Sequence, residues 1–371
     1  GVSVLISVGG AGHSDYFMNV TSDSAACRTF ADSLLDFCLS RGYDGIDLDW
    51  EPLNSAEKGE RLTLLASQLR QTIASRAPSL LLTMAVPAGD WFGHRLDFSA
   101  LEQEVDWFHL MTYDFFWSTA GYANHNAPLY SPSQSQYDYG SVDAGITYLH
   151  TTRGVKIEKI VMGIPFYGHA CRASGLFQNN NGYIGWYNYQ DIQGLIESGW
   201  DFFWVETGRV PFLLDEARTT FVTFDDTTSV RLKCEYAREK NLAGVCIWEL
   251  SQGKTDQGQP LLESVAHASG KNTSVRTRSR VKEDLKKIPL QIYPNPCCDH
   301  TFVAFFLRKR TRVRLELVSI LGQRLDTVVE KNLERGYQRI KVDTRHYPSG
   351  EYLIRIMTPV SRGGKKMVIV R

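Results

Sequence analysis

Hydrophobic residues in the first two thirds of the chain fall into short runs that are separated by longer amphipathic stretches. The runs cover residues 2–9, 45–50, 80–88, 107–113, 160–167 and 244–250. They are short and almost entirely apolar, which is typical of strands buried on both faces of a sheet. Between them, residues 25–40 and 57–77 repeat apolar positions with the period of an α-helix. This alternation predicts a parallel sheet with helices outside, either doubly wound or a barrel.

The residues that close each run favour the barrel, because they are glycines, acids and aromatics. Functional side chains at the carboxyl ends of parallel strands are typical of the TIM-type (β/α)8 barrel. We therefore expect an α/β fold of this type over residues 1–266. Residues 168–223 are rich in Asn, Gly, Trp and Tyr and break the rhythm, so we expect an insertion there, before the last strand.

The remaining residues follow a different pattern. Residues 267–288 are rich in Ser, Thr, Lys and Arg, which predicts a linker. Residues 289–371 contain short stretches of alternating apolar and polar residues, such as 312–317, with turn signals between them. This pattern predicts a small, all-β antiparallel sandwich as a second domain.

Composition and charge are consistent with two folding units and narrow the class of protein. Of the 371 residues, 43% are hydrophobic and 12% aromatic, which excludes disorder for most of the chain. Residues 1–270 carry 18 basic and 32 acidic side chains, whereas residues 271–371 carry 23 and 9. No polybasic block marks nucleic acid as a partner, and no apolar run is long enough for a membrane span. The seven cysteines lack the spacing of a metal site, so we expect free thiols, no metal and no cofactor.

The strongest chemical signal is a row of acids in the second apolar run. Because side chains alternate along a strand, Asp47, Asp49 and Glu51 share one face and lie about 7 Å apart, while Leu48 and Trp50 share the other face. Ionised acids at this spacing repel one another, so at least one pKa should rise and a proton should be shared within the row. An acid that stays protonated near neutral pH can act as a general acid. We expect Glu51, nearest the carboxyl end of the strand, in that role, with Asp49 orienting it and Asp47 tuning Asp49.

Two other interpretations of the acid row remain open. An exposed acidic strand is one, but it gives no reason for Ile46, Leu48 and Trp50 to stand between the acids. A site for Ca²⁺ or Mg²⁺ is the other, since these ions prefer oxygen ligands. A single strand rarely supplies all the ligands, however, and the sequence offers no second acid-rich loop.

Several segments resemble motifs of glycoside hydrolase family 18, the chitinase family. Residues 44–51 resemble its DxxDxDxE signature, residues 7–10 its SxGG motif and residues 111–114 its MxYD motif. Residues 126–130, 163–168 and 248–250 are similar to further segments of that family and follow in the same order. The resemblance implies hydrolysis of β-1,4-N-acetylglucosamine linkages with retention of configuration. It also implies that the substrate's own acetamido carbonyl attacks the anomeric carbon, in place of an enzyme nucleophile.

The resemblance implies a role for each residue of the site. Glu51 would protonate the glycosidic oxygen and then act as base toward water, while Asp49 would accept the acetamido N–H. Tyr113 would donate a hydrogen bond to the acetamido oxygen, and Asp47 would complete the catalytic set. Substrate contacts are expected from Trp248, as an apolar floor, and from Asp114, Met111 and Tyr167. Trp117 and Trp91 are further candidates for substrate contact, because they lie in or near loops after strands, with packing as the alternative role for each. Structural support is expected from Asp44, Ser7, Gly9 and Gly10.

The first apolar run begins closer to the start of the sequence than the resemblance leads us to expect. In the family that the sequence resembles, two βα units precede the strand with the SxGG motif, and here that strand begins at Val2. We therefore expect six barrel-type strands in place of eight, with two open edges, which is an unfavourable state for a sheet. We also expect the sequence to be an N-terminally shortened part of a longer protein.

The tail resembles the C-terminal sorting domain of type IX secretion systems. The matching segments are residues 293–296, 320–323, 333–336, 348–353 and 365–370. The resemblance implies export across the outer membrane of a Gram-negative bacterium, to the cell surface or the medium, with the secretion machinery as partner. The alternative is a carbohydrate-binding β-sandwich, for which Tyr337, Tyr347 and Tyr352 are the candidate surface aromatics.

Together these patterns predict a secreted chitinase that acts as a monomer on chitin or chito-oligosaccharides. Two alternatives stay open. One is an endo-β-N-acetylglucosaminidase that releases N-glycans. The other is a catalytically impaired chitin-binding lectin, although lectins of this fold typically lack the acid at the position of Glu51.

Overall fold

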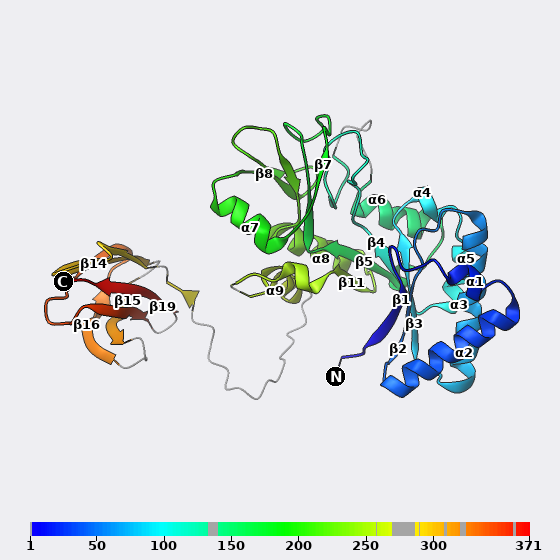
Figure 1. Ribbon diagram of the computed structural model, residues 1–371, viewed down its shortest axis with the longest axis horizontal. Coiled ribbons are helices and arrows are strands. Elements are labelled where there is room, and N and C mark those ends of the chain that lie inside the picture. Colours follow the sequence, from blue (N-terminus) through cyan, green and yellow to red (C-terminus); the bar gives the residue numbers. More distant parts are fainter. Residues whose placement is uncertain are drawn as a thin grey trace. The chain divides into compact units, whose positions relative to one another are not determined.

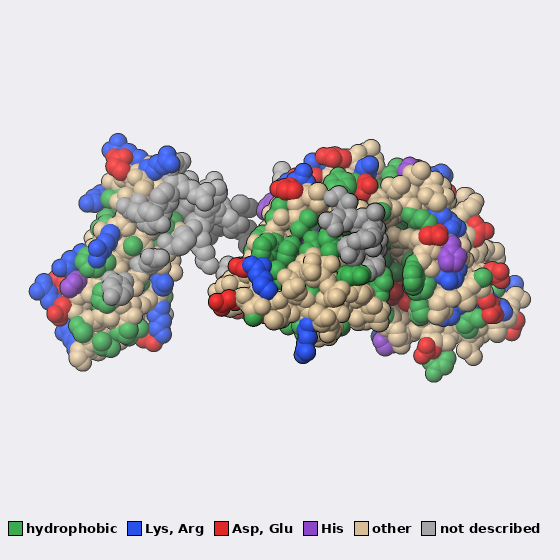
Figure 2. Space-filling view, turned by 90° about the horizontal axis from the view of Figure 1, so that it is seen from above, with side chains coloured by type: hydrophobic (Ala, Val, Ile, Leu, Met, Phe, Trp, Pro, Cys, Tyr) green, Lys and Arg blue, Asp and Glu red, His purple; other side chains and the backbone are tan. Residues whose placement is uncertain are grey.

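A computed structural model describes residues 2–132, 140–256, 258–268, 286–288, 290–307, 310–319, 324–358 and 361–371. The chain divides into two compact units, Gly1–Thr273 and Ser274–Arg371, and each is described by itself. In Figure 2, Lys and Arg side chains are spread over the visible face of the smaller unit, in line with its excess of basic residues. Among the described helices, none combines the length and apolar character that a membrane span needs.

The six apolar runs form one parallel sheet with the strand order β1-β2-β3-β4-β5-β11 (Figure 1). The strands are β1 (Leu5–Gly9), β2 (Gly45–Asp49), β3 (Leu81–Pro87), β4 (Trp107–Met111), β5 (Ile160–Pro165) and β11 (Gly244–Trp248). In register, Asp47 of β2 lies opposite Ser7 of β1 and Thr83 of β3. The prediction of a parallel sheet built from these runs is confirmed.

Strands β1 and β11 are the two edges of this sheet, and within the described residues each pairs with one neighbour. The six strands therefore form an open sheet of the barrel type. Both edges are partly exposed: Val4, just before β1, is 53% exposed, and so is Trp248 at the end of β11. The central strands are buried, as Ile46, Leu82 and Leu110 show with no exposed surface.

Helices follow the strands and pack beside the sheet (Figure 1). They are α1 (Phe17–Val20), α2 (Ser24–Arg41), α3 (Ala56–Arg76), α4 (Asp90–Gly93), α5 (Phe98–Glu104), α6 (Val142–Thr147), α8 (Thr227–Glu239) and α9 (Pro260–Ala268), with a π-helical turn (Tyr148–Thr152) and 3-10 turns (Ile157–Lys159 and Leu250–Gly253). The boundaries of α2 follow from its sequence. The carboxylate of Asp23 accepts hydrogen bonds from the first free N–H groups, and Gly42 ends the helix with a φ of +72°.

The predicted insertion is an α+β unit between β5 and α8. Its five antiparallel strands have the order β7-β6-β10-β9-β8. They are β6 (Tyr167–Cys171), β7 (Tyr183–Asn188), β8 (Asp201–Val205), β9 (Val210–Leu214) and β10 (Phe221–Thr223), with helix α7 (Tyr189–Glu197) between β7 and β8. The loop after β4 covers part of this sheet, because Phe116 packs with Cys171 and Phe221 in one apolar cluster.

The smaller unit consists of two sheets with the strand orders β12-β19-β18-β15-β16 and β13-β14-β17. Its strands are β12 (Lys286–Lys287), β13 (Gln291–Tyr293), β14 (His300–Leu307), β15 (Thr311–Ser319), β16 (Arg324–Leu333), β17 (Gly336–Asp343), β18 (Gly350–Met357) and β19 (Ser361–Ile369). All pairs are antiparallel except β12 with β19. Val303, Leu315 and Ile354 contribute to its own buried core. Most of the predicted linker, residues 269–285, and the segment 320–323 lie outside the described residues.

Candidate active site

The acid row lies on β2 and just beyond its carboxyl end, and its side chains divide between two faces as the alternation predicts. Leu48 and Trp50 are buried in the core, 0% and 2% exposed, and the ring of Trp50 stacks on Phe17 with centroids 4.7 Å apart. Asp47, Asp49 and Glu51 occupy the other face. The apolar residues between the acids thus anchor the strand in the core and leave the acids free for chemistry.

Asp47 is held by donors from three different strands. Ser7 Oγ donates to Oδ2 at 3.0 Å, and Thr83 Oγ1 donates to Oδ1 at 2.6 Å. The Nδ1 atom of His109, on β4, lies 3.1 Å from Oδ1. Burial raises the pKa of Asp47, but the contacts with His109, Thr83 and Ser7 outweigh burial and bring the pKa below its usual value. Asp47 is therefore the ionised member of the row.

The pKa values of Asp49 and Glu51 are raised, in contrast to that of Asp47. Asp49 is 8% exposed, and its buried Oδ1 has no hydrogen-bond partner among the described residues. Burial, followed by the charge of Asp47, raises the pKa of Asp49 to about 6. Burial, followed by the charges of Asp49 and Asp114, raises the pKa of Glu51 to about 7. Between about pH 6 and about pH 7 these values favour a proton on Glu51, while Asp49 and Asp47 are ionised.

The end of β1 holds the backbone around Asp49. Gly9 and Gly10 have φ of +107° and +95°, which side-chain-bearing residues rarely adopt. A Cβ at Gly9 would lie 2.2 Å from the carbonyl oxygen of Asp49, and Gly10 N–H donates to that oxygen at 2.5 Å. Ser14 Oγ accepts the N–H of Glu51 at 3.0 Å. These contacts fix the backbone of Asp49 and Glu51 and thereby the direction of their side chains.

Tyr113 and Asp114 follow β4, and after burial and Asp49 the charge of Asp114 is a further cause of the raised pKa of Glu51. The ring of Tyr113 lies over β5, since a Cβ at Gly163 would be 2.7 Å from its Cε1 atom. Asp114 has a φ of +58°, and its N–H donates to Asn126 Oδ1 at 2.9 Å. Its Oδ1 accepts from Tyr167 Oη at 2.6 Å and lies 2.8 Å from His169 Nε2. The first residues of the insertion therefore position Asp114.

The tryptophans expected at the site are placed at the ends of three different strands. Trp91, on α4 after β3, is 76% exposed, and its ring centroid lies 6.4 Å from that of Trp117 in the loop after β4. Trp248 ends β11, is 53% exposed and precedes a cis peptide bond. Met111 ends β4 and is partly buried.

Asp44 has a different role, because its Oδ2 accepts the N–H of Val4 at 2.7 Å at the other end of β2. It ties β1 to β2 at the amino ends of the two strands. Two histidines belong to the site although the sequence motifs do not contain them, His109 beside Asp47 and His169 beside Asp114. The sequence could have indicated His109, because it stands two residues before Met111 and therefore on the same face of β4.

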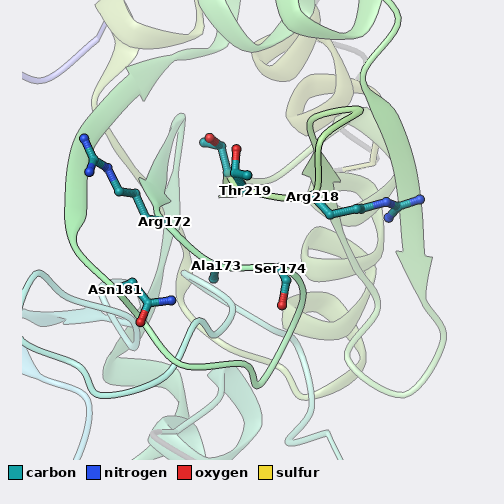
Figure 3. Close-up of a pocket in the computed structure, with 7 residues that line it drawn as sticks. Arg172, Ala173, Ser174, Asn181, Arg218 and Thr219 are labelled. Carbon is teal, nitrogen blue, oxygen red and sulfur yellow. The ribbon is translucent and has the colours of Figure 1, made fainter.

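A separate cavity of about 480 Å³ lies in the insertion, and none of its lining residues belongs to the acid row. Its lining consists of Arg172, Ala173, Ser174, Asn181, Arg218, Thr219 and Thr220. Figure 3 shows the side chains of Arg172 and Arg218 leading away from each other at opposite sides of this hollow. Arg218 is engaged by Asp201 at 2.6 Å. The described residues hold no cluster of His, Cys, Asp and Glu suited to a metal ion.

An acid row at the carboxyl end of an inner strand of a parallel sheet, with exposed tryptophans after β3 and at the end of β11, is typical of glycoside hydrolases of the barrel type. Residues 1–253 match the family described as "Glycosyl hydrolases family 18", and the chain belongs to this family. Residues 291–370 match the family described as "Secretion system C-terminal sorting domain". Both resemblances expected from the sequence are confirmed.

Two relatives illustrate the similarity in sequence. Chitinase A1 of Niallia circulans is 31% identical over 284 residues, which cover 67% of this chain and 40% of that protein. Chitinase 1 of Aphanocladium album is 30% identical over 278 residues, which cover 72% of this chain and 65% of that protein. The chain thus spans less than two thirds of the length of either relative.

Solved structures show the same fold. Catalytic domain 2 of the Group II chitinase of Ostrinia furnacalis has a TM-score of 0.66 and 26% identity, over 72% of this chain and 77% of that one. A family 18 N-acetylglucosaminidase from Paenibacillus barengoltzii has a TM-score of 0.66 and 27% identity, over 72% and 82%. Human YKL-39, described as a pseudo-chitinase with retained chitooligosaccharide binding, shares the fold at a TM-score of 0.67 and 24% identity, over 72% and 80%. The fold by itself therefore does not decide whether a chain is a catalyst.

Proposed function

We propose that this protein hydrolyses β-1,4 linkages between N-acetylglucosamine residues in chitin or chito-oligosaccharides, with retention of configuration. The observation that carries the proposal is the graded acid row. Asp47 is held ionised by Ser7, Thr83 and His109, whereas the pKa values of Asp49 and Glu51 rise to about 6 and about 7. This gradient favours a proton on Glu51, at the carboxyl end of the row, where a general acid needs it.

In the proposed mechanism, Glu51 donates its proton to the glycosidic oxygen as the bond to the anomeric carbon breaks. The acetamido carbonyl oxygen of the same sugar attacks that carbon and forms a cyclic oxazolinium ion, so no side chain becomes covalently attached. Asp49 accepts the acetamido N–H and offsets the positive charge, while Tyr113 donates to the acetamido oxygen. Glu51 then takes a proton from water, which opens the ring with the original configuration restored.

The remaining site residues would bind the sugar chain. Trp248 provides the apolar floor for the reacting sugar, and Asp114, positioned by Tyr167 and His169, accepts hydrogen bonds from a neighbouring sugar. Trp91 and Trp117, side by side, offer a stacking surface. Met111 and Tyr167 complete the set of proposed substrate contacts.

We assign residues 1–266 to the catalytic unit, with the insertion at 168–223, and residues 289–371 to a sorting domain. The match of the tail to sorting domains supports export across the outer membrane of a Gram-negative bacterium, to the surface or the medium. The alternative, a carbohydrate-binding β-sandwich with a row of aromatic side chains on its surface, has little support. Tyr352 is 9% exposed and Tyr347 Oη donates to Asp326 at 2.8 Å, while the side chain of Tyr337 lies outside the described residues.

The test is hydrolysis of a chromogenic chito-oligosaccharide by the protein and by its Glu51→Gln variant. We expect turnover by the first and a loss of about 10²- to 10⁴-fold in the second, with oligosaccharide binding retained. Unchanged turnover in Glu51→Gln would refute the assignment of Glu51. Binding without turnover in the unaltered chain would favour the lectin. Release of N-glycans from a glycoprotein in a parallel assay, with chitin left intact, would favour the endo-β-N-acetylglucosaminidase.

A further inference from the structure

Strand β7 is an edge of the insertion sheet and carries an exposed tryptophan. Trp186 is 59% exposed, and none of the ring contacts recorded among the described residues involves its indole. A single exposed apolar residue needs no explanation by itself. The strand register, however, relates Trp186 to the candidate active site.

Trp186 lies directly opposite His169 of β6 in the antiparallel pair. Residues that face each other in this way have Cβ atoms about 5 Å apart, on the same face of the sheet. His169 Nε2 lies 2.8 Å from Asp114 Oδ1. The face that carries Trp186 is therefore the face that reaches the candidate active site, and the three residues follow one another from Asp114 toward the edge of the insertion.

A β-bulge brings Trp186 to this face. Tyr183 pairs with Cys171 and Gly185 pairs with Ala170, so that Ile184 is an extra residue in β7. In a regular strand, residues three apart point to opposite faces. With the bulge, Tyr183 and Trp186 share one face, and Tyr183 Oη lies 2.7 Å from His169 Nδ1. Gly185 has a φ of +149°, a conformation that glycine adopts most readily. Bulges of this kind redirect side chains next to active sites.

The opposite face of the same sheet has the usual role of packing. Gly185, Ala170, Val222, Leu213 and Phe202 lie opposite one another across the five strands. Ala170, Val222 and Leu213 have no exposed surface and belong to the core of the catalytic unit. Phe202, at the far edge on β8, is 44% exposed. The sheet thus offers two exposed aromatic residues at opposite edges and on opposite faces, of which Trp186 alone shares a face with His169.

We propose that Trp186 is a sugar-stacking platform that extends the candidate site, binding the apolar face of a pyranose ring in a β-1,4-linked N-acetylglucosamine chain beyond the sugar held by Asp114. An indole offers a large, flat, apolar surface whose N–H stays available for a hydrogen bond. This inference rests on the proposed function, since it names a further contact for the same substrate. It predicts that long chains gain affinity from Trp186 and that short ones do not.

The experiment measures binding by calorimetry in the Glu51→Gln background, which prevents hydrolysis. The ligands are chitotriose and chitohexaose. Adding Trp186→Ala is expected to weaken chitohexaose binding roughly 3- to 10-fold and to leave chitotriose binding unchanged. Trp186→Tyr should restore most of the loss, because it restores a ring. Phe202→Ala, an exposed aromatic on the other face, is the matched control and should leave both affinities unchanged.

The outcomes separate this inference from the proposed function. If the Glu51→Gln protein binds neither oligosaccharide, the proposed function fails. If it binds both and Trp186→Ala leaves both affinities unchanged, the platform is refuted while the proposed function stands. Equal weakening of the two ligands, or equal effects of Trp186→Ala and Phe202→Ala, also refutes the platform, because the change would then act on the whole site or on the fold. Thermal unfolding of each variant records any loss of stability.

Discussion

His109 Nδ1 lies 3.1 Å from Asp47 Oδ1, across the intervening strand β3. Together with Ser7 and Thr83, this contact lowers the pKa of Asp47 against the effect of burial. The charge that Asp47 retains is in turn one of the causes that raise the pKa of Asp49. A histidine outside the family motifs thereby influences the pH at which Asp49 becomes ionised.

We expect the pH profile of kcat/KM to be a narrow bell between about pH 6 and about pH 7. Glu51 must be protonated to act as an acid, so activity falls as pH rises through its pKa of about 7. Asp49 must be ionised to stabilise the intermediate, so activity falls as pH drops through its pKa of about 6. The two limits belong to the coupled pair. A profile that is flat from pH 5 to 8 would contradict this arrangement.

His109→Ala should move the acidic limit of that profile to higher pH. The charge of His109 lowers the pKa of Asp49, so its loss raises that pKa while Asp47 remains ionised near neutral pH. We expect a shift of roughly half a unit to one unit, and a shift of similar size in His109→Asn, which keeps a hydrogen-bond donor for Asp47 but not the charge. His267→Ala, exposed on α9, is the control. A fall in kcat with an unchanged profile would assign His109 to packing alone.

Gly163→Ala should impair catalysis through Tyr113. The new Cβ would stand 2.7 Å from the ring and 2.7 Å from the carbonyl oxygen of Leu110, so the ring must move. We expect kcat to fall about 10- to 100-fold, because small displacements of a catalytic group are costly. Gly244→Ala, in the neighbouring strand β11, has open space at its Cβ and is the matched control. Similar losses in both variants would argue against steric pressure on Tyr113.

His125 should make the catalytic unit lose stability in acid. It is fully buried, both ring nitrogens lack a partner among the described residues, and burial lowers its pKa from 6.5 to about 3. The unfolded chain therefore takes up a proton below pH 6.5 that the folded protein does not, which costs about 1.4 kcal/mol per pH unit. The stability is fully present above pH 6.5 and is lost as pH falls toward 3.

The measurement is the free energy of unfolding at pH 7 and pH 5, for the unaltered chain and for His125→Leu. The difference between the two proteins isolates His125 from the acids of the active site, which titrate in the same range. We expect the unaltered chain to lose more stability than His125→Leu between the two values. Equal losses would show that the folded protein accommodates the charged imidazole.

The buried ion pair between Lys233 and Asp225 should be essential for the stability of the catalytic unit. Nζ lies 2.6 Å from the carboxylate, and both side chains have no exposed surface. Lys233→Met leaves a buried carboxylate without its counter-charge, so we expect a loss of about 3–5 kcal/mol in the free energy of unfolding. The partly exposed pair of Arg231 with Glu235, on the same helix α8, is the control. Its Arg231→Ala variant should change stability by less than about 0.5 kcal/mol. Equal losses in the two variants would show that burial does not determine how much an ion pair contributes to the free energy of unfolding.

Local sequence determined the strands, the main helices and the faces of the acid row. The run 45–50 is short and apolar between its acids, so it could only be a buried strand with Asp47 and Asp49 on one side and Leu48 and Trp50 on the other. That inference needs only the two-residue period of a strand. The helix boundaries at Asp23 and Gly42 likewise follow from capping groups within a few residues.

Tertiary structure alone decided which side chains meet. His109 reaches Asp47 because β4 and β2 lie on either side of β3 with a particular register, and His169 reaches Asp114 because the insertion folds back over the loop after β4. The direction of Trp186 depends on one extra residue in β7, since a shift of one position turns a side chain to the other face. Local patterns carry no information on register or strand order, because both are set by packing between segments far apart in the chain. The sequence therefore determined the acids, whereas the assembled sheets decided their partners and their protonation.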